Sequence, residues 1–134
     1  MSAEPPEGFV PHARKSPVTD AWEPLFSRAF ENAVQIGVVV RPQHCVRGQP
    51  SRSFIATLAD NAMQLTCRTA LPAAADVLTA HLTIDYLGEA RLGQWLQVEP
   101  RILRVGGGIA FADALVTADG AIVARAGGSF RALG

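Results

Sequence analysis

The hydrophobic pattern of the chain changes character at one stretch near its middle. From residue 54 to about residue 70 apolar side chains follow one another almost continuously, with one carboxylate, Asp60, among them. A turn-forming segment, residues 48–53, precedes this stretch, and Pro72 follows it. Because a helix without a polar stripe must be covered on most of its sides, the pattern predicts a long, largely buried helix.

On both sides of this helix the pattern changes to a period of two, which is typical of half-buried strands. Alternating segments occupy residues 33–41, 77–86, 95–105, 109–117 and 121–130. Pro100 shifts the apolar phase and indicates a sheet edge or a bulge, and Asp119-Gly120 predicts a two-residue hairpin. We therefore expect an α+β fold in which a curved antiparallel sheet of about five strands wraps one helix.

The segment 77–86 alternates most regularly of the five. One face carries the apolar side chains of Leu78, Ala80, Leu82, Ile84 and Tyr86, and the other carries Thr79, His81, Thr83 and Asp85. This predicts a strand with one dry face and one solvated face.

The N-terminal region is less regular. Residues 1–17 are polar and interrupted by prolines, which predicts an arm that lies on the surface or is partly disordered. In residues 16–26, Thr19 or Asp20 is a suitable cap for a short helix with Pro24 in its first turn. We expect residues 1–30 to form an N-terminal extension with this short helix, and residues 31–134 to form the main domain.

Composition narrows the functional classes. The 134 residues suffice for one domain, and the 12 basic side chains equal the 12 acidic ones, so no basic field favours nucleic acid or anionic lipid. Cys45 and Cys67 form no CxxC motif, and no secretory signal pattern is evident. These features favour a cytoplasmic protein. No apolar run reaches the roughly 18 residues of a membrane span.

Asp60 is the residue that helix packing alone explains least well. Burying an ionised carboxylate costs several kcal/mol unless it is paired or reaches water. One interpretation places it on a wet or interfacial stripe, bonded to Asn61 or to an arginine. The other makes it a general base or nucleophile in a dry pocket.

The start of the helix offers a second candidate. Ser51, Arg52 and Ser53 lie where backbone N–H groups are unpaired, which suits an anion or a polarised carbonyl oxygen, although a serine there is also explained as a cap. Nine residues from Ser51 to Asp60 correspond to about 13 Å along the axis and roughly 180° around it. If both ends act in one reaction, the site must form between two antiparallel helices of a homodimer.

These motifs resemble the hotdog-fold acyl-CoA thioesterases, in particular the phenylacetate-pathway type. That family has an asparagine-containing loop, then G-x-x-H-G-G, then an apolar helix ending in L-A-D-x-A. The matching runs here are Gly48-Gln49-Pro50-Ser51-Arg52-Ser53 and Leu58-Ala59-Asp60-Asn61-Ala62, with Thr79 to Leu87 resembling the next strand. The resemblance covers about residues 33–133 and implies an acyl-CoA thioesterase that forms a homodimer and pairs into a tetramer.

The resemblance also implies roles for particular residues. Asp60 corresponds to the base or nucleophile, the backbone N–H of Arg52 to the group that polarises the thioester carbonyl from the other subunit, and Thr79 to the residue that assists water or orients the carboxylate. These roles agree with the charge stabilisation expected at a helix start. The candidate binding set comprises His44, Arg47, Gly48, Ser51, Ser53 and Asn61, with coenzyme A as part of the substrate and no separate cofactor.

The sequence departs from the family where His-Gly-Gly is replaced by Ser51-Arg52-Ser53 and the loop asparagine has no clear counterpart. Arg52 can block the site or reach a phosphate or carboxylate. Two hypotheses stay open, an active thioesterase and a hotdog protein that binds acyl-CoA without hydrolysing it. No carboxylate or cysteine stands at metal-ligand spacing around His44 or His81, so no metal site is expected.

Overall fold

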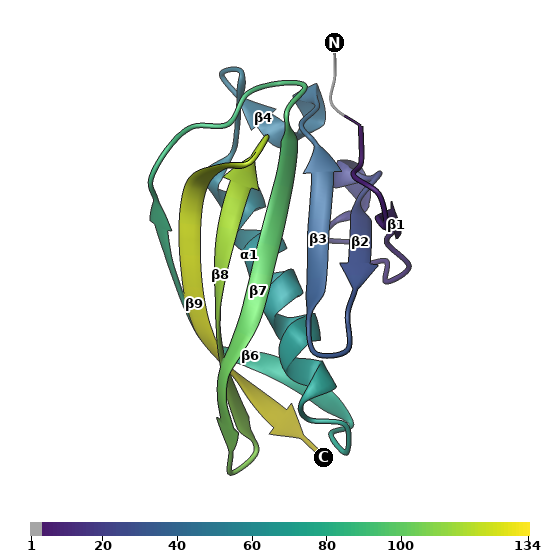
Figure 1. Cartoon of the computed structure of the whole chain (residues 1–134), viewed down its shortest axis with the longest axis vertical. Helices are drawn as coiled ribbons and strands as arrows, with labels where there is room; N and C mark the ends of the chain where they lie inside the picture. Colours follow the sequence, from purple (N-terminus) through teal and green to yellow (C-terminus); the bar gives the residue numbers. More distant parts are fainter. Residues whose placement is uncertain (1–3) are drawn as a thin grey trace.

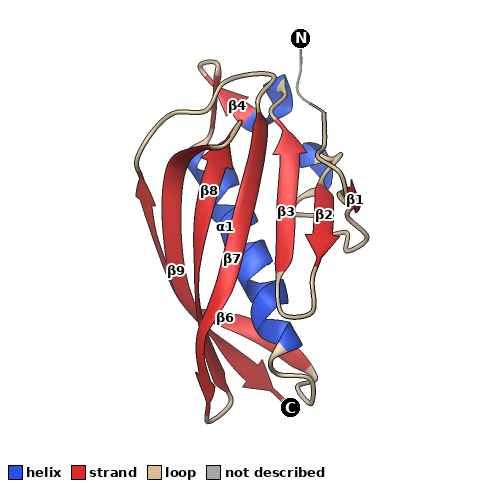
Figure 2. Cartoon of the chain, in the orientation of Figure 1, coloured by secondary structure: helices blue, strands red, loops and turns tan. Residues whose placement is uncertain are grey.

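The computed structural model describes residues 4–134, in which one long helix packs against a large antiparallel sheet (Figures 1 and 2). The helix, α1, spans Arg52–Thr69. The seven-stranded sheet has the order β1-β2-β3-β7-β8-β9-β6. Its strands are β1 (Val10–Pro11), β2 (Phe26–Ala29), β3 (Val34–Val39), β6 (Asp76–Tyr86), β7 (Trp95–Gly106), β8 (Ile109–Ala118) and β9 (Ala121–Leu133). The predicted arrangement of a sheet wrapped around one helix is confirmed.

The five predicted strands correspond to β3, β6, β7, β8 and β9, and two further strands come from the N-terminal region. β1 pairs with β2, and β2 pairs with β3, so residues 10–29 extend the same sheet. Strands of two and four residues are too short for a period-two pattern to reveal them. The boundary between the extension and the main domain stays a prediction.

The short N-terminal helix differs from the prediction. It is a 3-10 helix, η1 (Asp20–Trp22), and the Thr19 side chain makes no capping hydrogen bond. Pro24 lies beyond its end, in a segment that leads into β2, instead of in its first turn. Leu25, which retains 2% exposure, instead packs into the main core.

The helix is less uniformly buried than its sequence suggests. Phe54, Leu58, Met63 and Cys67 are fully buried against the sheet. A stripe on the other side is only half-buried and contains Ala56, Thr57, Asp60, Asn61, Gln64 and Leu65. Asp60 therefore lies on a half-buried stripe, and both sequence interpretations of this residue stay open.

Strand β6 contains an irregularity that reverses part of the predicted face assignment. Its register against β9 shifts between Thr79 and His81, which leaves Ala80 as an extra residue. Thr79 is opposite the buried Phe130, whereas Leu78 is 49% exposed. The bulge therefore places Thr79 on the helix side together with Leu82, Ile84 and Tyr86, and the prediction for Leu78 and Thr79 is wrong.

Two tight hairpins have the expected backbone geometry. Asp119 and Gly120 have φ values of 46° and 86°, which confirms the predicted two-residue turn between β8 and β9. A second hairpin joins β4 (Cys45–Val46) and β5 (Gln49–Pro50) through Arg47 and Gly48, with φ values of 57° and 80°. It follows the 3-10 helix η2 (Pro42–His44) and leads directly into α1.

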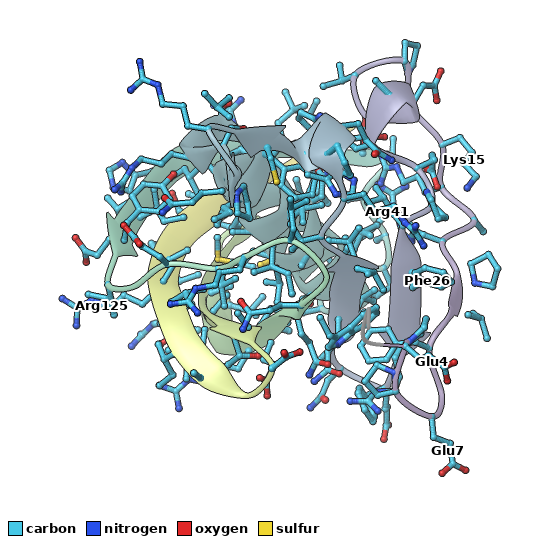
Figure 3. The ribbon with its side chains drawn as sticks, turned by 90° about the horizontal axis from the view of Figure 1, so that it is seen from above. Glu4, Glu7, Lys15, Phe26, Arg41 and Arg125 are labelled. Atoms are coloured by element: carbon cyan, nitrogen blue, oxygen red, sulfur yellow. The ribbon has the colours of Figure 1, made fainter. Side chains whose placement is uncertain are left out.

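The two edges of the sheet differ in character. The N-terminal strands, with Phe26, lie on one side of the molecule, and Arg125 of β9 lies on the opposite side, as the view from above shows (Figure 3). β3 pairs with only residues 95–98 of β7, so Pro100 lies on a locally free edge, as predicted.

Within residues 4–134, no helix has the length and hydropathy that a bilayer crossing requires.

Candidate active site

The carboxylate of Asp60 is held by one specific hydrogen bond. The hydroxyl of Thr79 on β6 donates to Oδ1 of Asp60 over 2.6 Å. The β6 bulge makes this contact possible, because it turns Thr79 toward the helix. The second carboxylate oxygen, Oδ2, makes no hydrogen bond within the described residues and can accept a proton from a water molecule.

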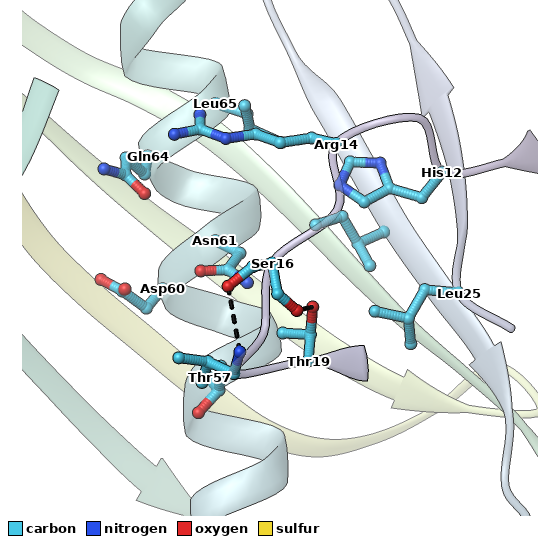
Figure 4. Close-up of a pocket in the computed structure, with 12 residues that line it drawn as sticks. His12, Arg14, Ser16, Thr19, Leu25, Thr57, Asp60, Asn61, Gln64 and Leu65 are labelled. Atoms are coloured by element: carbon cyan, nitrogen blue, oxygen red, sulfur yellow. Dashed lines mark hydrogen bonds between the residues drawn. The ribbon is translucent and has the colours of Figure 1, made fainter. Parts of the chain in front are cut away.

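A cavity of about 280 Å³ borders the same helix stripe. The helix contributes Thr57, Asp60, Asn61, Gln64 and Leu65, and the N-terminal segment contributes His12, Arg14, Ser16, Val18, Thr19 and Leu25, with Ile36 from β3 (Figure 4). Asp60 is therefore one of the residues that line a small, partly open cavity between the helix and the N-terminal segment.

The start of α1 is capped as its sequence predicts. The Ser51 hydroxyl accepts a hydrogen bond from the Phe54 N–H over 3.1 Å. The N–H groups of Arg52 and Ser53 make no hydrogen bond in the part of the chain that the structure describes. Together with the helix dipole, they can stabilise negative charge on an oxygen atom.

The Arg52 side chain has a defined position. Its guanidinium lies 4.5 Å from the ring centroid of Tyr86, in a cation–π contact, and the Tyr86 hydroxyl donates to the Arg52 carbonyl over 2.6 Å. The helix start is thereby fastened to the far end of β6. Burial raises the pKa of the Tyr86 hydroxyl, while the Arg52 charge opposes this rise.

Arg47 and Gly48 lie at the tip of the β4–β5 hairpin, next to the helix start. A surface hollow there is lined by Val46, Arg47, Gln49, Pro50, Ser51, Arg52 and Ser53. The structure thus brings together Arg47, Ser51, Arg52 and Ser53, four residues that the sequence selected. Two of them carry a positive charge.

His44, which the sequence predicted to bind substrate, is a buried residue that packs against the start of the helix. It is 1% exposed and stacks on Phe54 with 4.5 Å between the ring centroids. Its Nδ1 accepts from the Arg41 N–H over 3.0 Å, and its Nε2 donates to the Trp22 carbonyl over 2.8 Å. Both nitrogens are occupied, so His44 offers none to a ligand and leaves the candidate binding set.

The candidate residues thus form two groups within one chain. Asp60, Asn61 and Thr79 lie together, and Ser51, Arg52 and Ser53 lie two helical turns away with Arg47 and Gly48. Residues 4–134 contain no cluster of three histidine, cysteine or acidic side chains that could hold a metal ion.

Sequence reasoning missed His12 and Tyr86. His12 lies in an arm that its prolines made look irregular, and nothing in the local sequence shows that it lines a cavity. Tyr86 was assigned to the dry face, and only the fold reveals that it contacts Arg52.

Comparison with known proteins agrees with this architecture. The family model of the thioesterase superfamily matches residues 53–124. A Pseudomonas aeruginosa protein named as a putative esterase is 32% identical over an alignment of 127 residues, which covers 93% of this chain and 95% of that protein.

Solved structures share the fold at lower identity. A mutant of the phenylacetic acid degradation protein PaaI from Thermus thermophilus superposes with a TM-score of 0.77 at 20% identity, covering 88% of this chain and 100% of that one. A Streptococcus mutans protein solved with acetyl CoA gives 0.76 at 23% identity, covering 92% and 95%. Zebra fish thioesterase superfamily member 2 gives 0.73 at 22% identity, covering 82% and 81%. These likenesses confirm the predicted hotdog fold, and the sequence matches establish that the chain belongs to the thioesterase superfamily.

Proposed function

We propose that this protein hydrolyses acyl-CoA thioesters and that Asp60 is its base or nucleophile. The observation that carries the proposal is the 2.6 Å hydrogen bond from Thr79 to Asp60 at the border of a cavity. The esterase name of the P. aeruginosa relative and the acetyl CoA in the S. mutans structure support the substrate class. The proposed acyl group is short, of medium length or a small aromatic.

The chemistry follows from the orientation of the carboxylate. As a base, Asp60 uses Oδ2 to take a proton from water while the water oxygen bonds to the thioester carbon. The tetrahedral intermediate then breaks its C–S bond, and the leaving thiolate receives the proton. As a nucleophile, Oδ2 itself displaces the thiolate to form an anhydride, which water hydrolyses. In both routes the Thr79 hydroxyl holds Oδ1.

The free edge of β6 supports a shared site in a homodimer. β6 pairs with β9 on one side only, and an unpaired strand of 11 residues readily pairs with another chain. If two β6 strands pair about a two-fold axis at Thr83, His81 faces Asp85 of the second copy, and the bulge sets Thr79 opposite Tyr86 of that copy. The helix start at Arg52 then approaches Asp60 of the other chain.

In this dimer the start of α1 and its middle, at Asp60, have different roles. The Arg52 N–H polarises the thioester carbonyl, and the Arg47 and Arg52 side chains are placed to meet coenzyme A phosphates. Ser51 and Ser53 frame this end, and Gly48 permits the hairpin that presents Arg47. Asn61 faces the cavity on the carboxylate side.

The outer face of the sheet supports pairing of two dimers. It exposes the large apolar side chains of Phe111 and Leu115 on β8. Arg101 and Asp113 form a two-pronged ion pair beside them, with bonds of 2.8 and 3.1 Å. A mixed apolar and charged face of this kind suits a protein interface.

We also propose a cytoplasmic location, because Cys45 and Cys67 are both free thiols.

The activity is tested by thiol release from a panel of aliphatic and aromatic acyl-CoAs. We expect Asp60→Asn to lower kcat/KM by roughly 10²- to 10⁴-fold, the range of general base catalysis. Thr79→Val, which removes the hydroxyl and keeps the shape, is expected to cost roughly tenfold. Wild-type protein that releases no thiol from any member of the panel would contradict the proposal.

The role of the helix start is tested by Arg52→Pro, compared with Arg52→Ala. Proline is favoured at the first helical position and lacks only the N–H, so the helix is retained while the proposed carbonyl donor is lost. We expect Arg52→Pro to lower kcat by about 10²-fold, as for other oxyanion donors. Arg52→Ala keeps the N–H and is expected to change mainly KM.

A mixing experiment tests whether the two ends cooperate between chains. A heterodimer of Asp60→Asn and Arg52→Pro chains contains one intact site and is expected to recover activity that neither homodimer has. Equal inactivity of the mixture would overturn the shared site.

The second candidate function is acyl-CoA binding without hydrolysis. The Ser51-Arg52-Ser53 sequence and the Arg52 side chain resting on Tyr86 favour it, because bulk at this position narrows the approach to the helix start. It predicts thermal stabilisation by acyl-CoA with no thiol release. Under this alternative, a variant with Ser51→His, Arg52→Gly and Ser53→Gly gains activity.

A further inference from the structure

His12 is a buried histidine whose ring nitrogens have no hydrogen-bond partner within the described residues. Only 8% of its surface is exposed, and its backbone N–H donates to the Leu25 carbonyl over 2.9 Å. Its two ring nitrogens make no hydrogen bond within residues 4–134, and the ring lines the cavity beside Arg14 (Figure 4). Neither nitrogen is fully enclosed, because within residues 4–134 the buried side-chain nitrogen and oxygen atoms without a partner comprise only Oε2 of Glu23. A ligand oxygen in the cavity can therefore reach the ring and form a hydrogen bond with it.

Asn61, on the opposite wall of the cavity, also has a polar side chain without a hydrogen-bond partner in the described part of the chain. It is half-buried on the helix stripe, and its side-chain amide makes no hydrogen bond in the described part of the chain. Three other polar side chains of the cavity, unlike that of Arg14, have hydrogen-bond partners: Thr19 donates to the Ser16 carbonyl and Thr57 to the Ser53 carbonyl. Gln64 donates to the Val77 carbonyl. His12 and Asn61 are thus two unpaired groups on facing walls.

The cavity suits a small polar group. Its volume of about 280 Å³ is below the ~300–1,000 Å³ of pockets for drug-sized ligands. Burial lowers the pKa of His12, Glu23 opposes this shift, and Lys15 and Arg14 add to it. The neutral ring therefore has one donor and one acceptor at neutral pH. A plain alkyl chain would leave both unpaired.

We propose that this cavity is the acyl pocket and that His12, with Asn61, selects short acyl groups that carry a hydroxyl or carboxylate oxygen. This inference rests on the proposed thioesterase function. Asp60 borders the cavity, so the thioester carbon lies at its edge while the oxygen of the acyl group reaches between His12 and Asn61. His12 acts as a specificity residue and takes no part in breaking the C–S bond.

The test compares kcat/KM for acyl-CoAs matched in chain length: butyryl-CoA against 3-hydroxybutyryl-CoA, and pentanoyl-CoA against glutaryl-CoA. Wild-type protein is expected to prefer the oxygenated member of at least one pair. A preference in the first pair indicates recognition of a hydroxyl, and a preference in the second pair indicates recognition of a carboxylate. His12→Phe is expected to reduce that preference about threefold to tenfold, the value of one neutral hydrogen bond. His12→Gln retains a donor and an acceptor and serves as the matched control, with the preference largely kept.

The outcomes separate this inference from the proposed function. No thiol release from any substrate contradicts the function itself. Hydrolysis of both members of each pair at equal rates, or a preference that His12→Phe leaves unchanged, overturns the inference and leaves the thioesterase intact. Loss of stability alone would assign His12 to an internal contact with Glu23. If His12→Phe does not fold, Asn61→Leu is measured instead, and an unchanged preference there overturns the inference equally.

Discussion

At the scale of single residues, the two buried histidines show how the same side chain serves different ends. His44 has a partner for each ring nitrogen and a stacked ring beneath it, so it holds the 3-10 helix η2 against the start of α1. His12 has the burial without the partners. The contacts of the fold therefore account for the burial of His44 but not for that of His12.

His44 also predicts an acid sensitivity of the fold. Burial lowers its pKa below the ordinary value of 6.5, the Arg41 charge adds to this, and the hydrogen bond to Trp22 opposes it. The unfolded chain therefore binds more protons at low pH, so stability is fully present above pH ~6.5 and is lost as the pH falls toward the folded-state pKa. His12 contributes in the same direction.

We expect the free energy of unfolding, measured with urea, to fall between pH 7.5 and pH 5.5. His44→Gln, which can still accept from Arg41 and donate to Trp22, is expected to flatten this fall because it cannot take up the proton. Measurements of both proteins at pH 8 provide the reference. Parallel pH curves for the two proteins would exclude His44 as a source of the effect.

At the scale of elements, close packing between strands explains positions that chemistry does not. Gly37 of β3 lies beneath the Trp95 ring of β7, which also contacts Phe9 edge-on with 5.0 Å between centroids. A Cβ at Gly37 would lie 2.2 Å from Trp95 Cζ2. The contact fastens the N-terminal segment and β3 to the long strands.

We therefore expect Gly37→Ala to destabilise the protein by about 1–3 kcal/mol, the usual cost of overpacking. Gly106→Ala is the matched control, since a Cβ there meets nothing within 4 Å. It is expected to change the free energy of unfolding by less than ~0.5 kcal/mol. Chemical denaturation checks both variants, and equal effects would contradict the proposed packing role of Gly37.

At the scale of the whole molecule, the long unpaired edge of β6 is the feature that most needs a partner. The opposite edge of the sheet ends in the short strands β1 and β2. β6 exposes 11 residues of backbone and carries Thr79 and Tyr86 near its two ends. Pairing with a second copy would satisfy this edge and unite the two halves of the candidate site.

We expect Thr83→Lys to weaken the dimer, because the proposed two-fold axis sets two residues 83 face to face and like charges repel there. Thr83→Val keeps the size of the side chain and is expected to remain dimeric. Sedimentation analysis reports the assembly state, and thiol release is expected to fall in parallel with dissociation. An active Thr83→Lys monomer would overturn the interchain site.

The sequence alone determined the long helix, five of the strands and the hairpin at Asp119 and Gly120, because hydrophobic periodicity and turn chemistry are local properties. It also selected Asp60 and the helix start, since a carboxylate in an apolar helix is conspicuous without any structure. The tertiary structure decided which groups meet. The bulge that turns Thr79 toward Asp60, the cation–π contact between Arg52 and Tyr86, and the cavity that His12 lines all depend on strand register and on contacts between distant segments. No local pattern encodes these, because each arises from residues that are brought together only when the sheet wraps the helix.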